Sequence, residues 1–221
     1  MKRNKMLVGM VTGLIALFIM ANSLLATTVN ITPSDDLWLI SRAPDNNLRT
    51  LTTMRVGPRA DEGMNRSIVK FDLSTIPQGA VITSVKLYLY ATQTAENTSD
   101  FYDVYTASGT GVTTWNYTTA TWNSTQPNWT YTLAEDDEVF ITQAGFYSWD
   151  ITSSLSAGDI VTFGILSKIE EASTNQRAYF ATSRYEDTNS HPYLEITYTV
   201  PEPTAMMMLL LSGIGFIRKF R

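Results

Sequence analysis

The chain has 221 residues, a formal net charge of −5 and no cysteine, which excludes disulfide bonds and cysteine-ligated metal sites. Six of the 16 Lys and Arg residues lie at the two ends, and all 21 Asp and Glu residues lie between positions 27 and 204. This region therefore carries ten positive and 21 negative side chains, a net charge of −11. Such an acidic region is a poor partner for nucleic acid, whose binding requires neutralised phosphates.

The N-terminal segment has the order of charges and apolar residues that is typical of a secretory signal peptide. Three cations between Lys2 and Lys5 precede an apolar run, Met6–Ala21, and small or polar residues follow up to Ala26. This order predicts a signal helix over residues 1–26, with Ser23 as the other candidate for the last residue before cleavage. An uncleaved anchor is the alternative interpretation, because Met6–Leu25 could nearly span a bilayer.

The region 27–199 has the composition and spacing of an all-β domain. The clearest strand is Val81–Ala91, where apolar and polar positions alternate over the whole segment, and Ser67–Leu73 repeats the pattern. Further strands are predicted at 28–32, 37–40, 51–56, 101–105, 139–142, 146–151, 160–167, 178–182 and 193–199. Many short strands without a helical period predict one antiparallel β-sandwich of the jelly-roll kind, with Trp115–Tyr131 as its longest loop.

The C-terminal segment, residues 200–221, is similar to the PEP-CTERM sorting signal of bacteria. Pro201, Glu202 and Pro203 end the last strand, an apolar run covers Ala205–Ile217, and Arg218, Lys219 and Arg221 close the chain. As a helix the run reaches only about 20 Å, which is short for a membrane span. The resemblance implies transient residence in the inner membrane, recognition by an exosortase, and delivery to the cell surface or extracellular matrix.

Five sequence blocks of the central region resemble the DNRLRE domain, a family that overlaps carbohydrate-binding module family 96. They are 66–89, the loop tryptophans 115 and 122, 149–152, 180–184 and 192–198. The resemblance implies a β-sandwich that binds polysaccharide, with acidic polymers such as alginate among the ligands. One position departs from the family pattern, because Tyr117 stands where an acidic residue is expected; a metal-binding role for that acid is therefore not carried over.

The outward faces of the two best strands supply the candidate ligand-binding residues. If both strands lie in one sheet, Lys70 and Lys86 share a face with Tyr88 and Tyr90, and Arg66 abuts it. Aromatic rings form flat apolar platforms for sugars, and cations pair with uronate carboxylates. The alternative is that these are ordinary solvent-facing residues of an antiparallel sheet.

Other charged and aromatic residues allow two interpretations each. Arg42, Arg49, Arg55, Arg59 and Arg66 could form a basic strip that attracts a polyanion, but scattered ion pairs with neighbouring acids are the favoured interpretation for all except Arg66, which adjoins the strand carrying Lys70. The loop tryptophans at positions 115, 122 and 129 could be exposed sugar platforms, but anchoring of the long loop to the core is favoured.

Metal binding and catalysis have weaker support. Asp35 and Asp36, or Asp136 and Asp137, offer oxygen ligands for a structural calcium ion, although neither pair has the spacing of a calcium-binding loop. No cofactor is required. His191 is the only histidine, so a triad or a zinc site cannot be assembled from histidine and cysteine. We therefore expect a non-enzymatic polysaccharide-binding protein; a structural matrix or adhesion protein is the alternative, followed by a small glycan hydrolase or lyase.

Overall fold

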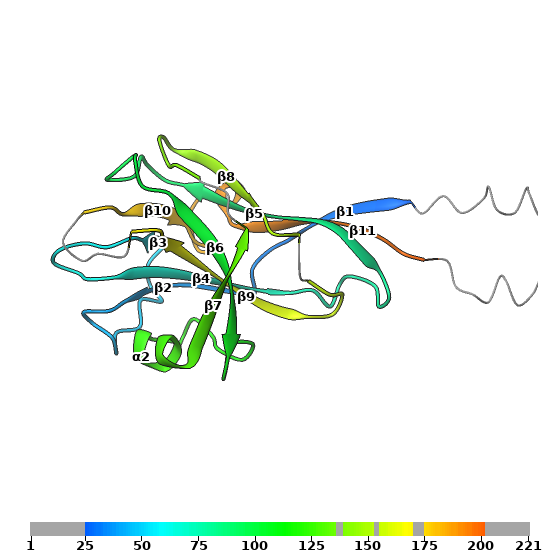
Figure 1. The fold of residues 1–221 in the computed structure, drawn as a ribbon, viewed down its shortest axis with the longest axis horizontal. Coiled ribbons are helices and arrows are strands. Elements are labelled where there is room, and N and C mark those ends of the chain that lie inside the picture. Colours follow the sequence, from blue (N-terminus) through cyan, green and yellow to red (C-terminus); the bar gives the residue numbers. More distant parts are fainter. Residues whose placement is uncertain (1–24, 136–138, 153–154, 170–174, 202–221) are drawn as a thin grey trace, which may run out of the picture.

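The computed structural model describes residues 25–135, 139–152, 155–169 and 175–201, and these form two antiparallel sheets packed face to face (Figure 1). The predicted all-β sandwich is thus confirmed. The predicted signal helix lies outside the described residues apart from its last two positions, and Ala26 already opens the first strand. Within the described ranges, no helix is long and apolar enough to span a membrane.

Sheet A runs in the order β1-β11-β5-β10-β3, and β8 also pairs with β5. Its strands are β1 (Ala26–Ile31), β3 (Thr53–Val56), β5 (Val81–Ala91), β8 (Gly145–Asp150), β10 (Ala178–Ala181) and β11 (Tyr193–Thr199). The first and last strands pair along their whole length, from Ala26 opposite Thr199 to Ile31 opposite Leu194. The two ends of the domain therefore lie side by side at one edge of the sandwich (Figure 1).

Sheet B runs in the order β2-β4-β9-β6-β7. Its strands are β2 (Asp35–Ile40), β4 (Asn65–Asp72), β6 (Tyr102–Gly109), β7 (Trp129–Glu135) and β9 (Ile160–Ser167). The predicted loop Trp115–Tyr131 extended over the first three residues of β7, and no strand was predicted for the rest of it. Conversely, the strand predicted at 139–142 is only a single bridge between Phe140 and Phe101.

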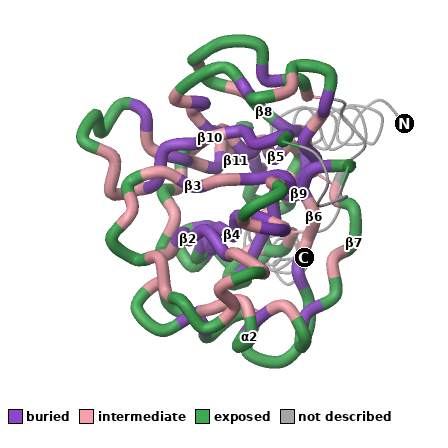
Figure 2. The backbone as a smooth tube through the Cα atoms, turned by 90° about the vertical axis from the view of Figure 1, so that its left-hand side faces the viewer, coloured by how far each residue is buried: buried purple, intermediate pink, exposed green. Residues whose placement is uncertain are grey.

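The main core lies between the two sheets and is formed by the inward residues of alternating strands, which Figure 2 shows as buried segments in the middle of the molecule. Its largest fully buried side chains include Trp149 from sheet A and Phe71 and Phe163 from sheet B. Trp149 also links the sheets directly, since its indole Nε1 donates a hydrogen bond to the Tyr102 carbonyl at 2.7 Å. Burial of this apolar surface is the main stabilising contribution.

A second, smaller core covers the outer face of sheet B. Leu37, Leu39 and Ile68 point away from the main core, and the segment between β6 and β7 folds over them with Trp115 and Trp129. This segment contains the short helix α2 (Trp122–Thr125), whose N-cap Thr121 forms a capping box with Ser124. The outer face of sheet B is therefore buried by the segment between β6 and β7, residues 110–128, which we call the cover.

A buried ion pair lies beneath this cover. The Lys70 ammonium contacts the Asp35 carboxylate at 2.6 Å, donates a hydrogen bond to the Trp115 carbonyl, and lies 5.1 Å from the centre of the Trp115 ring. Only 8% of Lys70 is exposed. This corrects the prediction that Lys70 faces solvent for ligand binding: its side chain does leave the outer face of β4, but the loop covers that face.

Replacing Lys70 with alanine should lower the free energy of unfolding by about 3 kcal/mol, because it leaves Asp35 buried without its cation. Lys86→Ala is the matched control: this lysine is also on a central strand but is half-exposed, so its loss should change stability by less than about 1 kcal/mol. Urea unfolding followed by tryptophan fluorescence measures both changes. Equal losses in the two variants would show that the cover does not depend on the buried pair.

Candidate functional site

The outer face of sheet A carries the predicted aromatic residues. On β5, Val85, Leu87 and Leu89 are fully buried in the main core, so the alternate residues Tyr88 and Tyr90 leave the opposite face. Both tyrosines are half-exposed, as the alternation in the sequence predicted. Among the described residues, no segment comparable to the cover of sheet B forms a second core on this face.

Four aromatic rings from three strands form one cluster on this face, which we call the aromatic platform: Tyr88, Tyr90, Phe146 and Tyr193. Tyr88 and Tyr193 stack with their ring centres 4.6 Å apart and an angle of 9° between the planes. Phe146 meets Tyr90 edge-on at 5.2 Å and Tyr193 edge-on at 5.8 Å. Phe146 is 43% exposed and the three tyrosines are half-exposed, so the platform presents apolar ring surface to solvent.

Strand pairing explains why the sequence revealed only half of the platform. Tyr193 lies opposite Tyr88 in the β11–β5 pair, and Phe146 lies opposite Tyr90 in the β5–β8 pair. These residues are far apart in the chain, and no local pattern specifies which strands become neighbours. The alternation within β8 and β11 was the signal available in the sequence. It places Phe146 and Tyr193 on the outward sides of their strands, but it does not place them beside Tyr88 and Tyr90.

A row of charged residues crosses the same face beside the platform. Lys86 lies between Glu195 on one neighbouring strand and Asp150 on the other. Directly opposed side chains have Cβ atoms about 4.5–5.5 Å apart, so the lysine is flanked by carboxylates on both sides. Burial raises the pKa of Tyr193, and the neighbouring Tyr88 and the Glu195 carboxylate raise it further, which agrees with a locally negative surface.

The prediction of a single face containing both lysines is wrong, because β4 belongs to sheet B and β5 to sheet A. The chain crosses from one sheet to the other in the turn between them. Arg66 likewise lies on the sheet B side, where its guanidinium is 5.4 Å from the ring centres of both Trp122 and Tyr131 and donates to Gln126 at 2.8 Å. Arg66 therefore holds the cover in place, and it is far in the fold from Lys86.

The two aspartates proposed as calcium ligands do not converge. Asp35 and Asp36 are consecutive residues of β2, so their side chains leave opposite faces of the strand. Asp35 pairs with Lys70, and Asp36 pairs with Arg184 at 2.8 Å. This geometry does not support a calcium site shared by the two carboxylates. The alternative pair, residues 136 and 137, lies outside the described residues.

Two of the three loop tryptophans, Trp115 and Trp129, anchor the cover, as the favoured interpretation predicted, whereas Trp122 is half-exposed and packs at the edge of the smaller core with Arg66 over its ring. Trp115 donates from its indole to the Thr162 hydroxyl at 2.9 Å, and Trp129 donates to the Thr110 carbonyl at 3.0 Å. Both side chains are buried. A hollow of about 300 Å³ lies beside them, lined by small residues of the same loop. Because the ring faces are used in packing, these tryptophans are not open sugar platforms.

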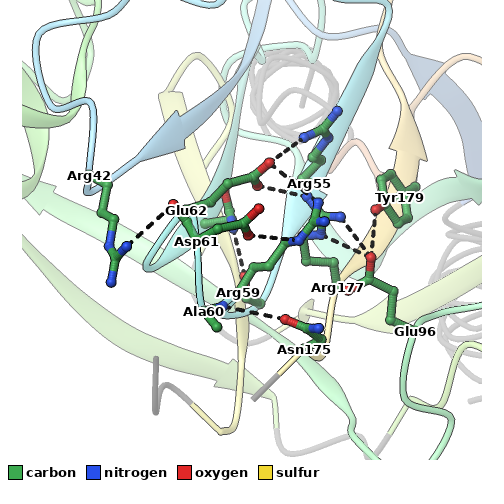
Figure 3. Close-up of polar contacts among 12 residues, drawn as sticks. Arg42, Arg55, Arg59, Ala60, Asp61, Glu62, Glu96, Asn175, Arg177 and Tyr179 are labelled. Atoms are coloured by element: carbon green, nitrogen blue, oxygen red, sulfur yellow. Dashed lines mark hydrogen bonds and ion pairs between the residues drawn. The ribbon is translucent and has the colours of Figure 1, made fainter. Parts of the chain in front are cut away.

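Figure 3 shows three arginines of the predicted basic strip near the edge of sheet A: Arg42 donates to the Asp61 backbone carbonyl, at 3.5 Å, whereas Arg55 and Arg59 belong to an ion-pair network that we call the neutral network. Glu62 accepts from Arg55 at 3.1 Å and pairs with Arg177 at 2.7 Å, and Arg59 pairs with Asp61 at 2.8 Å. Arg177, which is only 3% exposed, also contacts Glu96 at 2.7 Å. Three arginines thus face three carboxylates, so these six residues carry no net charge, as the favoured interpretation of paired charges predicted.

The described residues contain no group of three or more His, Asp and Glu side chains placed to hold a metal ion. His191 shares a hydrogen bond of 2.9 Å between its Nε2 and the Tyr185 carbonyl, in the turn before β11. The sorting residues Glu202, Pro203, Arg218, Lys219 and Arg221 lie outside the described residues, whereas Pro201 is an exposed position two residues after the end of β11.

Comparison with known proteins gives one family. Residues 27–198 match the family described as carbohydrate-binding module family 96, which covers nearly the whole sandwich. No curated protein matches the chain. The matched region includes the aromatic platform, the cover of sheet B and the neutral network.

The neutral network should make the domain sensitive to acid. Burial alone would raise the pKa of Glu96, but hydrogen bonds from Arg177 and Tyr179 outweigh it and the pKa falls below its usual value of 4.5. A lowered pKa in the folded state contributes stability above pH 4.5 that is lost as the pH falls through the folded pKa. Thermal unfolding between about pH 7 and pH 3 should therefore show a smaller loss of stability for Glu96→Gln than for the wild type.

The control for this measurement is Glu186→Gln, which removes one carboxylate at an exposed loop position. Its stability should follow the wild-type pH profile. An unchanged profile in Glu96→Gln would contradict a stabilising role for the Glu96 charge in the network.

Proposed function

The chain belongs to carbohydrate-binding module family 96, and we propose that it binds polysaccharide on the outer face of sheet A through the aromatic platform. Membership of a family of binding modules favours recognition over catalysis. The domain would act as an exported protein that attaches to glycan at the cell surface or in the extracellular matrix.

The observation that carries this proposal is the contrast between the two outer sheet faces. The face of sheet B is buried beneath its own loop, with Trp115 and Trp129 packed on Ile68. On sheet A, four aromatic rings remain at the surface, and Phe146 and Ser148 are exposed. A polymer that needs a long, accessible surface therefore finds it on sheet A and not on sheet B.

The chemistry of this face suits sugars. The CH faces of a pyranose ring are apolar, so they gain from contact with an aromatic ring, while hydroxyl groups at the sugar edge need hydrogen-bond partners. The platform supplies the rings on β5, β8 and β11, and Ser148 and Lys86 beside it supply polar groups. Because the rings already pack against one another, little conformational entropy is lost when a ligand binds.

Export and retention at the surface are the second part of the proposal, and they rest on the two end segments of the sequence. The signal-like segment 1–26 and the Pro201-Glu202-Pro203 segment with its basic end support processing on both sides of the domain. Because β1 and β11 are neighbours, both processing points would lie at the same edge of the sandwich. Retention through this edge would leave the platform accessible.

Replacing Phe146 with alanine should weaken polysaccharide binding about tenfold, equivalent to about 1.4 kcal/mol, because it removes exposed ring surface from the platform. Phe140→Ala is the matched control. Phe140 is 38% exposed and also packs edge-on against one other phenylalanine, but it lies outside the platform. Affinity electrophoresis in gels that contain neutral and acidic polysaccharides compares the two variants with the wild type.

Equal binding by Phe146→Ala and the wild type would refute the platform as the binding surface. Absence of binding to every polymer would leave a structural protein of the same fold as the better description. Unfolding curves of both variants serve as the check that each chain is folded.

Processing at the C-terminal segment should be visible in the mass of the mature protein. In a bacterium that contains an exosortase, the recovered chain should lack the residues after the Pro201-Glu202-Pro203 segment, because the enzyme removes the tail at this signal. Pro201→Ala combined with Pro203→Ala should leave the tail attached. A mature wild-type chain that ends at Arg221 would contradict this part of the proposal.

A further inference from the structure

The charges around the aromatic platform indicate which class of glycan it accepts. Lys86 is the only cation among the residues of the four strands β1, β11, β5 and β8. The strand register places Glu195 and Asp150 on either side of it. This row across the sheet therefore has two negative charges and one positive charge.

Seven of the nine other cations of the domain pair with acids or lie over aromatic rings away from the platform, and the remaining two, Arg42 and Arg49, are exposed between β2 and β3. Of the ten Lys and Arg residues between 27 and 204, five form the ion pairs described above: Arg55, Arg59, Lys70, Arg177 and Arg184. Arg66 and Lys168 lie over aromatic rings, the latter 4.6 Å from the centre of Phe101. The region as a whole carries a net charge of −11. A uronate polymer would meet repulsion at the platform and across the surrounding surface.

Uncharged hydrogen-bonding groups continue the same face beyond the charged row. Ser84 lies opposite Thr197 in the β5–β11 pair, and Thr197 lies opposite Thr28 in the β11–β1 pair, where the two threonine hydroxyl oxygens are 2.9 Å apart. From Tyr90 to Ser84 the face extends about 20 Å along β5, at about 3.3 Å per residue. Aromatic rings at one end and hydroxyl groups at the other match the apolar faces and hydroxyl edges of uncharged sugars.

We infer that the platform binds a neutral polysaccharide and discriminates against acidic ones, with Glu195 and Asp150 as the residues that discriminate. This inference rests on the proposed function, since it names the ligand class of the same surface. It also revises the expectation from the family resemblance that acidic polymers are among the ligands. The half-exposed Lys86 supplies a hydrogen-bond donor to sugar hydroxyls, and its charge is opposed by its neighbours.

The test compares pairs of polymers that share a backbone and carry either neutral or charged substituents. The full chain is kept in a nonionic detergent because of its apolar ends and is run in native gels that contain one polymer each. Neutral hydroxyethylcellulose is compared with acidic carboxymethylcellulose, and methyl-esterified pectin is compared with acidic polygalacturonate. Galactomannan, xylan and alginate complete the panel, and each gel is run with calcium and with a chelator. The apparent affinity for at least one neutral polymer should be at least tenfold higher than that for any acidic polymer, with calcium and with the chelator. Phe146→Ala should abolish this difference in affinity.

The variant Glu195→Gln should raise the affinity for the acidic polymers about threefold, because it removes one of the flanking charges near the ligand. The matched control is Asp45→Asn, which changes the net charge equally but lies on the sheet B side, where Asp45 accepts a hydrogen bond from Asn123 at 2.8 Å. Asp45→Asn should leave all affinities unchanged within twofold.

Three outcomes would overturn the inference, and they separate it from the proposed function. Strongest retardation by an acidic polymer, lost in Phe146→Ala, would refute the neutral ligand but retain the platform. Retardation by alginate that requires calcium and is lost in Glu195→Gln would show that the carboxylates recruit acidic glycan through the cation. Absence of retardation by any polymer, or retardation that Phe146→Ala does not change, would refute the proposed function and the inference together.

Discussion

The ion pair between Lys70 and Asp35 beneath Trp115 is the interaction that determines which face of this sandwich is available. It fixes the loop between β6 and β7 over sheet B, where Leu37, Leu39 and Ile68 would otherwise be exposed apolar residues on a sheet face. Buried charges are tolerated only when they are paired, so the cover and the pair depend on each other. With that face occupied, the open surface of sheet A becomes the candidate for recognition.

The distribution of charge follows the same division of the molecule. Cations are concentrated where they hold segments together: Lys70 and Arg66 under and beside the cover, and Arg177 between Glu62 and Glu96 at the sheet edge. These interactions fix loops to the sandwich in a domain without disulfides. The outer face of sheet A carries the aromatic platform, Glu195 and Asp150, with Lys86 as its cation, and this combination supports the proposed preference for a neutral glycan.

The sequence was sufficient for the fold class and for the orientation of β5, because an alternation of eleven residues specifies which side chains face the core. It also indicated that Trp115 and Trp129 anchor a loop. It was insufficient for the site, because Phe146 and Tyr193 join Tyr88 only through strand pairing between distant segments. The grouping of Lys70 with Lys86 failed for a related reason: each strand alternates correctly, but the turn between them changes sheets.

The central claim is that glycan lies on the outer face of sheet A, and an NMR titration tests it most directly. Amide and aromatic signals of the isotope-labelled protein would be followed during addition of cellohexaose, xylohexaose, mannohexaose and maltohexaose in turn. Our account predicts that at least one of these neutral oligosaccharides shifts signals of Lys86, Tyr88, Phe146 and Tyr193, while signals of Trp115 and Trp129 stay in place. Shifts confined to the loop around Trp115 and Trp129 would contradict it.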